Sequence, residues 1–158
     1  FSDMYYNTAS VIIGPKGADK TISAEAFKGK NIGVQASTTH ANYAEKYYVP
    51  GGAVAKAYKG QDEANADLAA GRVDLVQAAG VVLSAWLASA EGACCEIYGA
   101  VPVDVEILGP GVGVGLRKED TALLEKINAA IKALSAKGTF DELSAKHKLT
   151  GLMTLPPK

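Results

Sequence analysis

The polar side chains at positions 37–40 are the part of this sequence best suited to chemistry. The stretch Gly33-Val34-Gln35-Ala36-Ser37-Thr38-Thr39-His40 runs from an apolar, strand-like segment into a helical pattern. Ligands of open α/β sheets sit at the carboxyl ends of strands, and the unpaired N–H groups of a helix N-terminus favour a carboxylate or another anionic oxygen. Ser37, Thr38, Thr39 and His40 add hydroxyl and imidazole groups, so the stretch predicts a binding site. The alternative is that Thr38 or Thr39 only caps the helix, because hydroxyl caps are common.

Motifs for nucleotide binding or nucleophilic catalysis are not found. Gly111, Gly113 and Gly115 alternate inside an apolar segment and do not open a helix, so the dinucleotide fingerprint is not met. Neither GxxxxGK[ST] nor GxSxG occurs. His40 and His147 lie far apart, and no CxxC is present. We therefore predict no catalytic residue, no metal site and no cofactor.

The only cysteines, Cys94 and Cys95, are neighbours in the sequence. A disulfide between adjacent residues needs a strained ring, so we expect two small, half-buried thiols instead. Cysteine usage therefore leaves the cellular compartment open. The single tryptophan, Trp86, follows Leu83 in a helical pattern and is expected to serve in packing.

Short apolar runs alternate with helical patterns, and this alternation must position the polar stretch. Strands are expected at 10–14, 31–35, 53–58 and 73–78, and helices at 38–48, 62–70 and 81–90. Further strands are expected at 103–107 and 111–116. A helix is then expected from Asp120, with an apolar stripe formed by Leu123, Leu124, Ile127, Ile131 and Leu134. A last helix begins with the capping box Thr139–Glu142 and runs to about His147. This order predicts an α/β fold with a mostly parallel sheet.

Composition excludes several classes of protein. The 158 residues have 48% hydrophobic and 21% charged content, typical of a globular chain. The formal net charge of −1 gives no reason to expect a nucleic acid partner, and no apolar run approaches the ~20 residues of a membrane span. There is no initiator methionine or signal peptide, so we expect a processed chain or a fragment.

Taken in order, these segments resemble the polar amino-acid family (family 3) of type II periplasmic solute-binding proteins, which serve ABC importers. The similar segments are Phe1-Ser2-Asp3-Met4-Tyr5-Tyr6, Phe27-Lys28-Gly29-Lys30-Asn31-Ile32-Gly33-Val34, Thr38-Thr39-His40, Asp67-Leu68-Ala69-Ala70-Gly71-Arg72-Val73-Asp74, Gly111-Val112-Gly113-Val114-Gly115-Leu116-Arg117-Lys118 and Lys137-Gly138-Thr139-Phe140. The resemblance covers nearly the whole chain.

The resemblance implies a two-lobed fold that closes on its ligand by a hinge. Residues 1–13 would be a crossover from the first lobe, 14–105 the second lobe, and 106–158 the return strand and closing helices of the first lobe. The N-terminal segment of the family would be missing. Self-association, or pairing with that segment, would then cover the apolar stripe of the closing helices.

The resemblance also implies the ligand site and the partners. Thr38, Thr39 and His40 would form the half of the site in the second lobe, flanked by Gln35, Ser37, Gln77 and Ala79. The implied partners are a small polar ligand, an amino acid or a similar carboxylate, and the permease of an ABC transporter, in the periplasm or outside the cell at the membrane. Two departures stand out: Ser37 replaces a glycine of the family, and Ala79 replaces an aspartate that pairs with the ligand's α-ammonium.

Two other functions remain open on the same scaffold. One is a dehydratase-type enzyme acting on a small carboxylate, for which His40 is the only general acid or base in this half of the site. The other is the ligand-binding sensor domain of a signalling protein.

Overall fold

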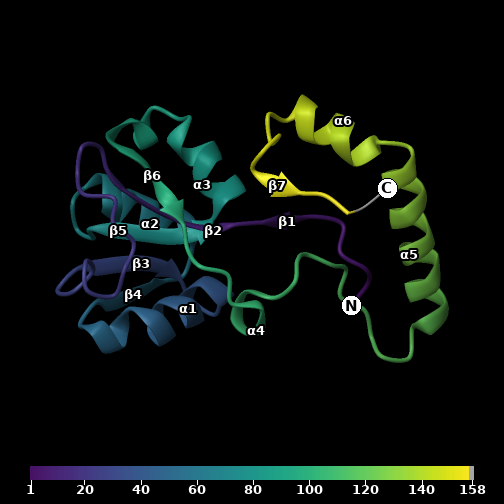
Figure 1. Cartoon of the computed structure of the whole chain (residues 1–158), viewed down its shortest axis with the longest axis horizontal. Coiled ribbons are helices and arrows are strands. Elements are labelled where there is room, and N and C mark those ends of the chain that lie inside the picture. Colours follow the sequence, from purple (N-terminus) through teal and green to yellow (C-terminus); the bar gives the residue numbers. More distant parts are fainter. Residues whose placement is uncertain (157–158) are drawn as a thin grey trace. The chain divides into compact units, whose positions relative to one another are not determined.

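The computed structural model describes residues 1–156, which separate into two compact units (Figure 1). The larger unit comprises 9–108, and the smaller unit combines 1–8 with 109–158. The lobe boundaries implied by the resemblance fall after residues 13 and 105, whereas the larger unit begins at Ala9 and ends at Leu108.

The larger unit is built on a five-stranded sheet. Its strands, in the spatial order β4-β3-β5-β2-β6, are β4 (Val54–Tyr58), β3 (Asn31–Gln35), β5 (Leu75–Ala79), β2 (Ser10–Pro15) and β6 (Cys95–Ala100). Strand β3 is parallel to β4 and β5, while β2 is antiparallel to β5 and β6. The predicted mostly parallel sheet is confirmed, with β2 as the one reversed strand.

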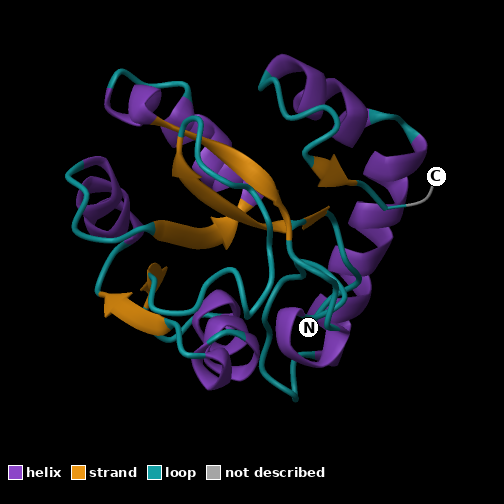
Figure 2. Cartoon of the chain, turned by 60° about the vertical axis from the view of Figure 1, so that its left-hand side comes forward, coloured by secondary structure: helices purple, strands orange, loops and turns teal. Residues whose placement is uncertain are grey.

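Helices cover both faces of this sheet (Figure 2). The longer ones are α1 (Thr39–Tyr47), α2 (Gln61–Ala69) and α3 (Gly80–Leu87). Each follows a strand of the parallel set within a few residues, so their N-termini lie at the same edge of the sheet. The shorter ones are η1 (Val49–Gly51), η2 (Glu91–Cys94) and α4 (Val105–Leu108).

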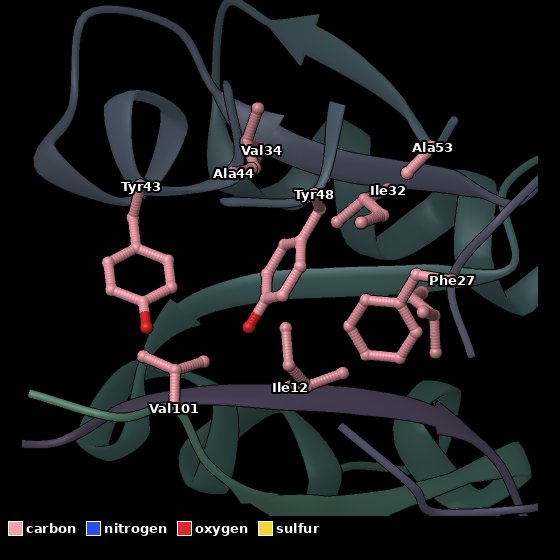
Figure 3. Packing of buried hydrophobic residues seen from close by; sticks show 10 residues of the cluster. Ile12, Phe27, Ile32, Val34, Tyr43, Ala44, Tyr48, Ala53 and Val101 are labelled. Carbon is pink, nitrogen blue, oxygen red and sulfur yellow. The ribbon is translucent and has the colours of Figure 1, made fainter. Parts of the chain in front are cut away.

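The two faces of the sheet have separate cores, and residues of β2 alternate between them. Ile12 belongs to the core beneath α1, where the rings of Tyr43, Tyr48 and Phe27 pack around it (Figure 3). Ile13 belongs to the opposite core, beneath α2 and α3. Burying a side chain of this size stabilises a fold by about 1.5–3 kcal/mol, so β2 anchors both layers.

Trp86 and Leu83 of α3 also pack in this second core. The expectation that Trp86 serves in packing is therefore confirmed.

The smaller unit holds two helices and a two-stranded sheet. These are α5 (Thr121–Ala136), α6 (Thr139–Lys146), and β1 (Asn7–Thr8) paired antiparallel with β7 (Met153–Thr154). Of the apolar stripe on α5, Ile131 is buried, whereas Leu123 and Leu134 are 50% and 39% exposed.

Four local expectations need correction. Residues 105–108 form α4 where a strand was expected, and Asp104 fixes this turn by accepting hydrogen bonds from the N–H groups of Glu106 and Ile107. The expected strand at 111–116 is an extended segment with one isolated bridge, Tyr6 to Val112. Strand β6 was not predicted at all.

The fourth correction concerns the start of α6. Gly138, in a left-handed conformation with φ of 75°, is its N-cap, and Thr139 is already helical. The predicted capping box is therefore wrong, because the backbone of Gly138 itself turns the chain from α5 into α6.

The cysteines also differ from the expectation of free thiols. The structure joins Cys94 to Cys95 in a disulfide, and no cysteine of residues 1–156 remains free. Cys94 ends η2 and is exposed, while Cys95 begins β6 and is buried. The expectation of two free thiols is therefore wrong, and the disulfide lies where a helical turn meets a strand.

Candidate functional site

The loop that joins β3 to α1 is held by backbone groups and by one threonine. The N–H of Ala36 donates to the carbonyl oxygen of Tyr58 at 2.8 Å, which ties the loop to β4. Thr38 is the N-cap of α1: its hydroxyl donates to the carbonyl oxygen of Gln35 at 2.8 Å and accepts from the N–H of Ala41 at 3.2 Å. The hydroxyl of Thr38 is therefore occupied by the cap, as the alternative reading of this loop requires.

Thr39 differs from its neighbour because its side chain is exposed at the first position of α1. Within residues 1–156, no hydrogen bond is made by the N–H groups of Thr39 or His40. The first turn of α1 also contains no acidic residue that would offset the partial positive charge of the helix N-terminus. These groups together offer hydrogen-bond donors to an anionic or polar oxygen.

His40 connects this turn to the sheet. Its Nδ1 lies 2.9 Å from the Oγ of Ser10 on β2, and the Nε2 of Gln77 on β5 donates to the same oxygen at 3.0 Å. The imidazole is half-buried, and burial lowers the pKa of His40 from its ordinary value. A lowered pKa favours the neutral ring at pH 7.

Of the remaining predicted residues, Gln77 is buried and Ala79 lies next to it in space. Ser10 and Ala79 are directly paired across β2 and β5, as are Ile12 and Gln77, so all these side chains share the face covered by α1. Gln77 has no exposed surface, so it acts on the site only through its hydrogen bond to Ser10. Ala79 is partly exposed and brings no charge.

The other two predicted residues flank the loop. Gln35 ends β3 and is half-buried, and its carbonyl oxygen receives the Thr38 hydroxyl. Ser37 is exposed, and its φ of 59° is a backbone conformation that residues other than glycine rarely adopt. The structure therefore places all seven predicted residues near one edge of the sheet, but only Ser37 and Thr39 among them are exposed.

Ser10 was missed by the sequence analysis, which treated it only as the start of a strand. A signal was available, because Ser10 is the one hydroxyl residue in the otherwise apolar run Ser10-Val11-Ile12-Ile13. A polar side chain that is only 4% exposed must find a partner, and His40 and Gln77 supply it.

A separate hollow of about 250 Å³ lies beside α1 in the larger unit. Tyr43, Tyr47 and Tyr48 line it, together with Pro102 and Asp104. None of the loop residues lines it, so it is distinct from the candidate site. No group of three or more potential metal ligands occurs among the residues described.

Comparison with known proteins places the chain in a family. The sequence model of bacterial extracellular solute-binding proteins, family 3, matches residues 1–150. This chain belongs to that family. It is 34% identical over 148 residues to the histidine-binding periplasmic protein of Escherichia coli (strain K12), and 36% identical over 148 residues to the L-arginine-binding protein of Pseudomonas aeruginosa.

The similarity extends over 93% of this chain but only 57% of either relative. Solved structures also have a similar fold. An ancestral arginine-binding protein bound to arginine has a TM-score of 0.80 and 33% identity, covering 92% of this chain and 62% of that one. The ancestral amino acid-binding protein AncCDT-1, a precursor of cyclohexadienyl dehydratase, has a TM-score of 0.73 and 28% identity, covering 92% and 59%.

No helix within residues 1–156 has the length and apolar character needed to cross a membrane.

Proposed function

We propose that this family 3 chain binds a small polar solute with a carboxylate or similar oxygen-bearing end and delivers it to an ABC transporter permease. The relatives are named for binding histidine or arginine, which supports an amino acid-like ligand, and the name of the Escherichia coli relative also says that it is periplasmic, which supports a periplasmic location. Closure of two lobes around the ligand would signal that the protein is loaded.

One observation carries the proposal: the first turn of α1 presents unused donors at the edge of the sheet. Thr39 is exposed while Thr38 is committed to the cap. Since a helix N-terminus with free N–H groups favours an anionic oxygen, the side chain of Thr39 would add a hydroxyl donor to the same ligand atom.

Replacing Thr39 tests the proposal in the protein expressed at the full length of its native gene. Thr39→Val should raise the dissociation constant for the ligand roughly tenfold to a hundredfold, because a hydrogen bond to a charged group contributes about 1.5–3 kcal/mol. Thr39→Ser keeps the hydroxyl and should retain most of the affinity. Unchanged affinity of Thr39→Val in calorimetric titration would remove Thr39 from the site.

Ala79 bears on which solute is bound. A buried ammonium group needs a charged or polar partner, since leaving it unpaired costs several kcal/mol. Ala79 is paired with Ser10 at the edge of the sheet where the candidate site lies, and it has no such group. We therefore expect a ligand whose nitrogen is absent, substituted or delocalised, and weak binding of ordinary α-amino acids.

A screen of the full-length protein against the standard amino acids and their deaminated or N-substituted analogues would test this expectation. Ala79→Asp should improve binding of a standard amino acid. Submicromolar binding of one by the natural protein, without improvement in Ala79→Asp, would contradict it.

The second candidate function is a dehydratase-type reaction on a small carboxylate. The likeness to AncCDT-1, a precursor of cyclohexadienyl dehydratase, supports this candidate. The neutral, half-buried imidazole of His40 is suited to act as a general acid or base. Consumption of a small carboxylate on incubation with the protein, lost in His40→Gln, would favour catalysis. Stoichiometric binding without consumption would favour transport.

A further inference from the structure

Three polar side chains, connected by hydrogen bonds, run from the sheet to its edge at the N-terminus of α1. Gln77 donates from Nε2 to the Oγ of Ser10 at 3.0 Å, and that oxygen lies 2.9 Å from the Nδ1 of His40. Ser10 and Gln77 are 4% and 0% exposed, whereas His40 is half-buried at the second position of α1. The path therefore joins two buried strands to a helix N-terminus.

The hydrogens available to these groups decide which nitrogen of the imidazole carries its proton. A serine hydroxyl has one hydrogen to donate and two lone pairs to accept with. Because Ser10 accepts from Gln77, its own hydrogen is free to go to Nδ1 of His40. An Nδ1 that accepts leaves the hydrogen of a neutral imidazole on Nε2.

The reverse arrangement leaves a buried donor without an acceptor. With the Gln77 amide oriented to donate, an Nδ1–H of His40 that donated to Ser10 would leave the hydroxyl hydrogen of Ser10 without an acceptor. Only a turned amide, presenting the Oε1 of Gln77 that otherwise has no hydrogen-bond partner among residues 1–156, could accept that hydrogen. An unsatisfied buried donor is costly. Burial also lowers the pKa of His40, which disfavours a ring with hydrogens on both nitrogens.

The surroundings of His40 indicate which ligand groups this tautomer can bind. The first turns of α1 and α3 contain no acidic residue, and Ala79 opposite Ser10 is uncharged. The free N–H groups that α1 presents at this edge can only donate, and the hydroxyl of Thr39 can donate as well. An Nε2–H on His40 would extend this set of donors with a neutral group that can donate but cannot accept.

We infer that Ser10 and Gln77 are positioning residues that fix His40 as the Nε2–H tautomer, so that His40 donates to an acceptor oxygen of the ligand and disfavours an ammonium at that position. The inference rests on the proposed function only for the identity of the group that His40 meets. The tautomer itself is a property of the chain without ligand.

The tautomer is measured by two-bond ¹H–¹⁵N correlation spectra of the ¹⁵N-histidine-labelled full-length protein at about pH 8, with His40→Gln used for assignment. We expect the pattern of a single Nε2–H form for His40. In Ser10→Ala, the ring should exchange between both tautomers. Ser84→Ala is the matched control, because Ser84 also has a buried hydroxyl in the larger unit but lies outside this path, and its spectrum should match the natural one.

An Nδ1–H form of His40 in the natural protein would overturn the inference, since it means that Gln77 faces Ser10 with its oxygen. A tautomer unchanged in Ser10→Ala would overturn the positioning role of Ser10.

Unlabelled L-arginine and L-histidine, the ligands in the names of the relatives, and their deaminated analogues, which should bind more tightly because Ala79 offers an α-ammonium no partner, serve as probes of the donor role. On binding of any of them, the Nε2–H proton of His40 should shift downfield, and Ser10→Ala should raise the dissociation constant about fivefold. Binding without any change at Nε2–H would overturn the donor role. Failure of both probes and their analogues to bind, with the Nε2–H form intact, would count against the proposed function and leave the tautomer established.

Discussion

At the scale of single residues, Ser37 shows how this loop departs from ideal backbone geometry. Its φ of 59° is left-handed, a conformation that costs a residue with a side chain about 1–2 kcal/mol relative to glycine. The resemblance implies a glycine at this position, and the structure explains the preference. The loop keeps its shape because Thr38 and Ala36 tie its two ends to the sheet.

We expect Ser37→Gly to stabilise the chain by about 0.5–1 kcal/mol, because the relief of backbone strain exceeds the extra flexibility of glycine in the unfolded chain. Ala36→Gly is the control, since Ala36 has no positive φ to relieve and glycine there should destabilise. Urea unfolding of the three chains measures the difference. A Ser37→Gly chain less stable than the natural one would contradict the expectation.

His40 should make folding stability depend on pH in the weakly acidic range. Its ordinary pKa of 6.5 is lowered by burial in the folded chain. Below pH 6.5 the unfolded chain therefore binds a proton that the folded chain does not, and stability falls as the pH drops towards the folded pKa. Above pH 6.5 the imidazole is neutral in both the folded and the unfolded chain, so it costs no folding stability there.

Unfolding curves of the natural chain and of His40→Gln between pH 5 and 8 would measure this effect. We expect the natural chain to lose stability more steeply on acidification than His40→Gln does. Parallel curves would show that the imidazole is not desolvated.

The residues of the candidate site could be predicted only as far as local sequence reaches. Thr38, Thr39 and His40 follow one another, and the transition from strand to helix marks them. Ser10 and Gln77 lie 30 or more positions away from His40, and only the pairing of β2 with β5 brings them together. Nothing in a single sequence specifies that pairing. The resemblance therefore implied Gln77 as a site residue, but its contact through Ser10 to His40 could not be predicted.

At the scale of elements, two threonines that look alike in the sequence have different structural roles. Thr38 caps α1 through its hydroxyl, whereas Thr139 is the first helical residue of α6 and Gly138 takes the cap position. Thr38→Ala should cost about 1 kcal/mol of stability, the usual value for a lost N-cap, and Thr139→Ala less than about 0.5 kcal/mol.

Chemical denaturation of both variants measures these differences. Equal losses would mean that the predicted capping box at Thr139 does form. A negligible loss in Thr38→Ala would show that its two hydrogen bonds are readily replaced by water.

Elements with a strong local signal were predicted well. The helices at 39–47 and 121–136 and the strands at 31–35 and 54–58 appear within a few residues of the expected positions. The errors fall where tertiary contacts decide. The alternating run 103–107 looks like a strand, but Asp104 accepts from the backbone at 106 and 107, pairs with Lys46 on α1 at 2.9 Å, and turns the chain into α4.

At the scale of the whole molecule, the smaller unit leaves apolar side chains in contact with water. Leu123 and Leu134 are three helical turns apart on α5 and so lie on the same side, and Leu143 on α6 is 46% exposed. Exposed apolar patches drive association. We expect this chain of 158 residues to self-associate at high concentration, and a Leu123→Glu, Leu134→Lys double variant to shift it towards the monomer.

Light scattering as a function of concentration measures this association. A compact monomer of the natural chain at high concentration would contradict the expectation.

Trp86 is the only tryptophan of the sequence, and it packs in the core beneath α2 and α3 of the larger unit. The longest helix, α5, lies in the smaller unit. Intrinsic fluorescence therefore reports the melting of one unit, while far-ultraviolet circular dichroism contains a large signal from the other. Coincident transitions by the two probes would mean cooperative unfolding of the entire chain, and separated transitions would give each unit a melting temperature of its own.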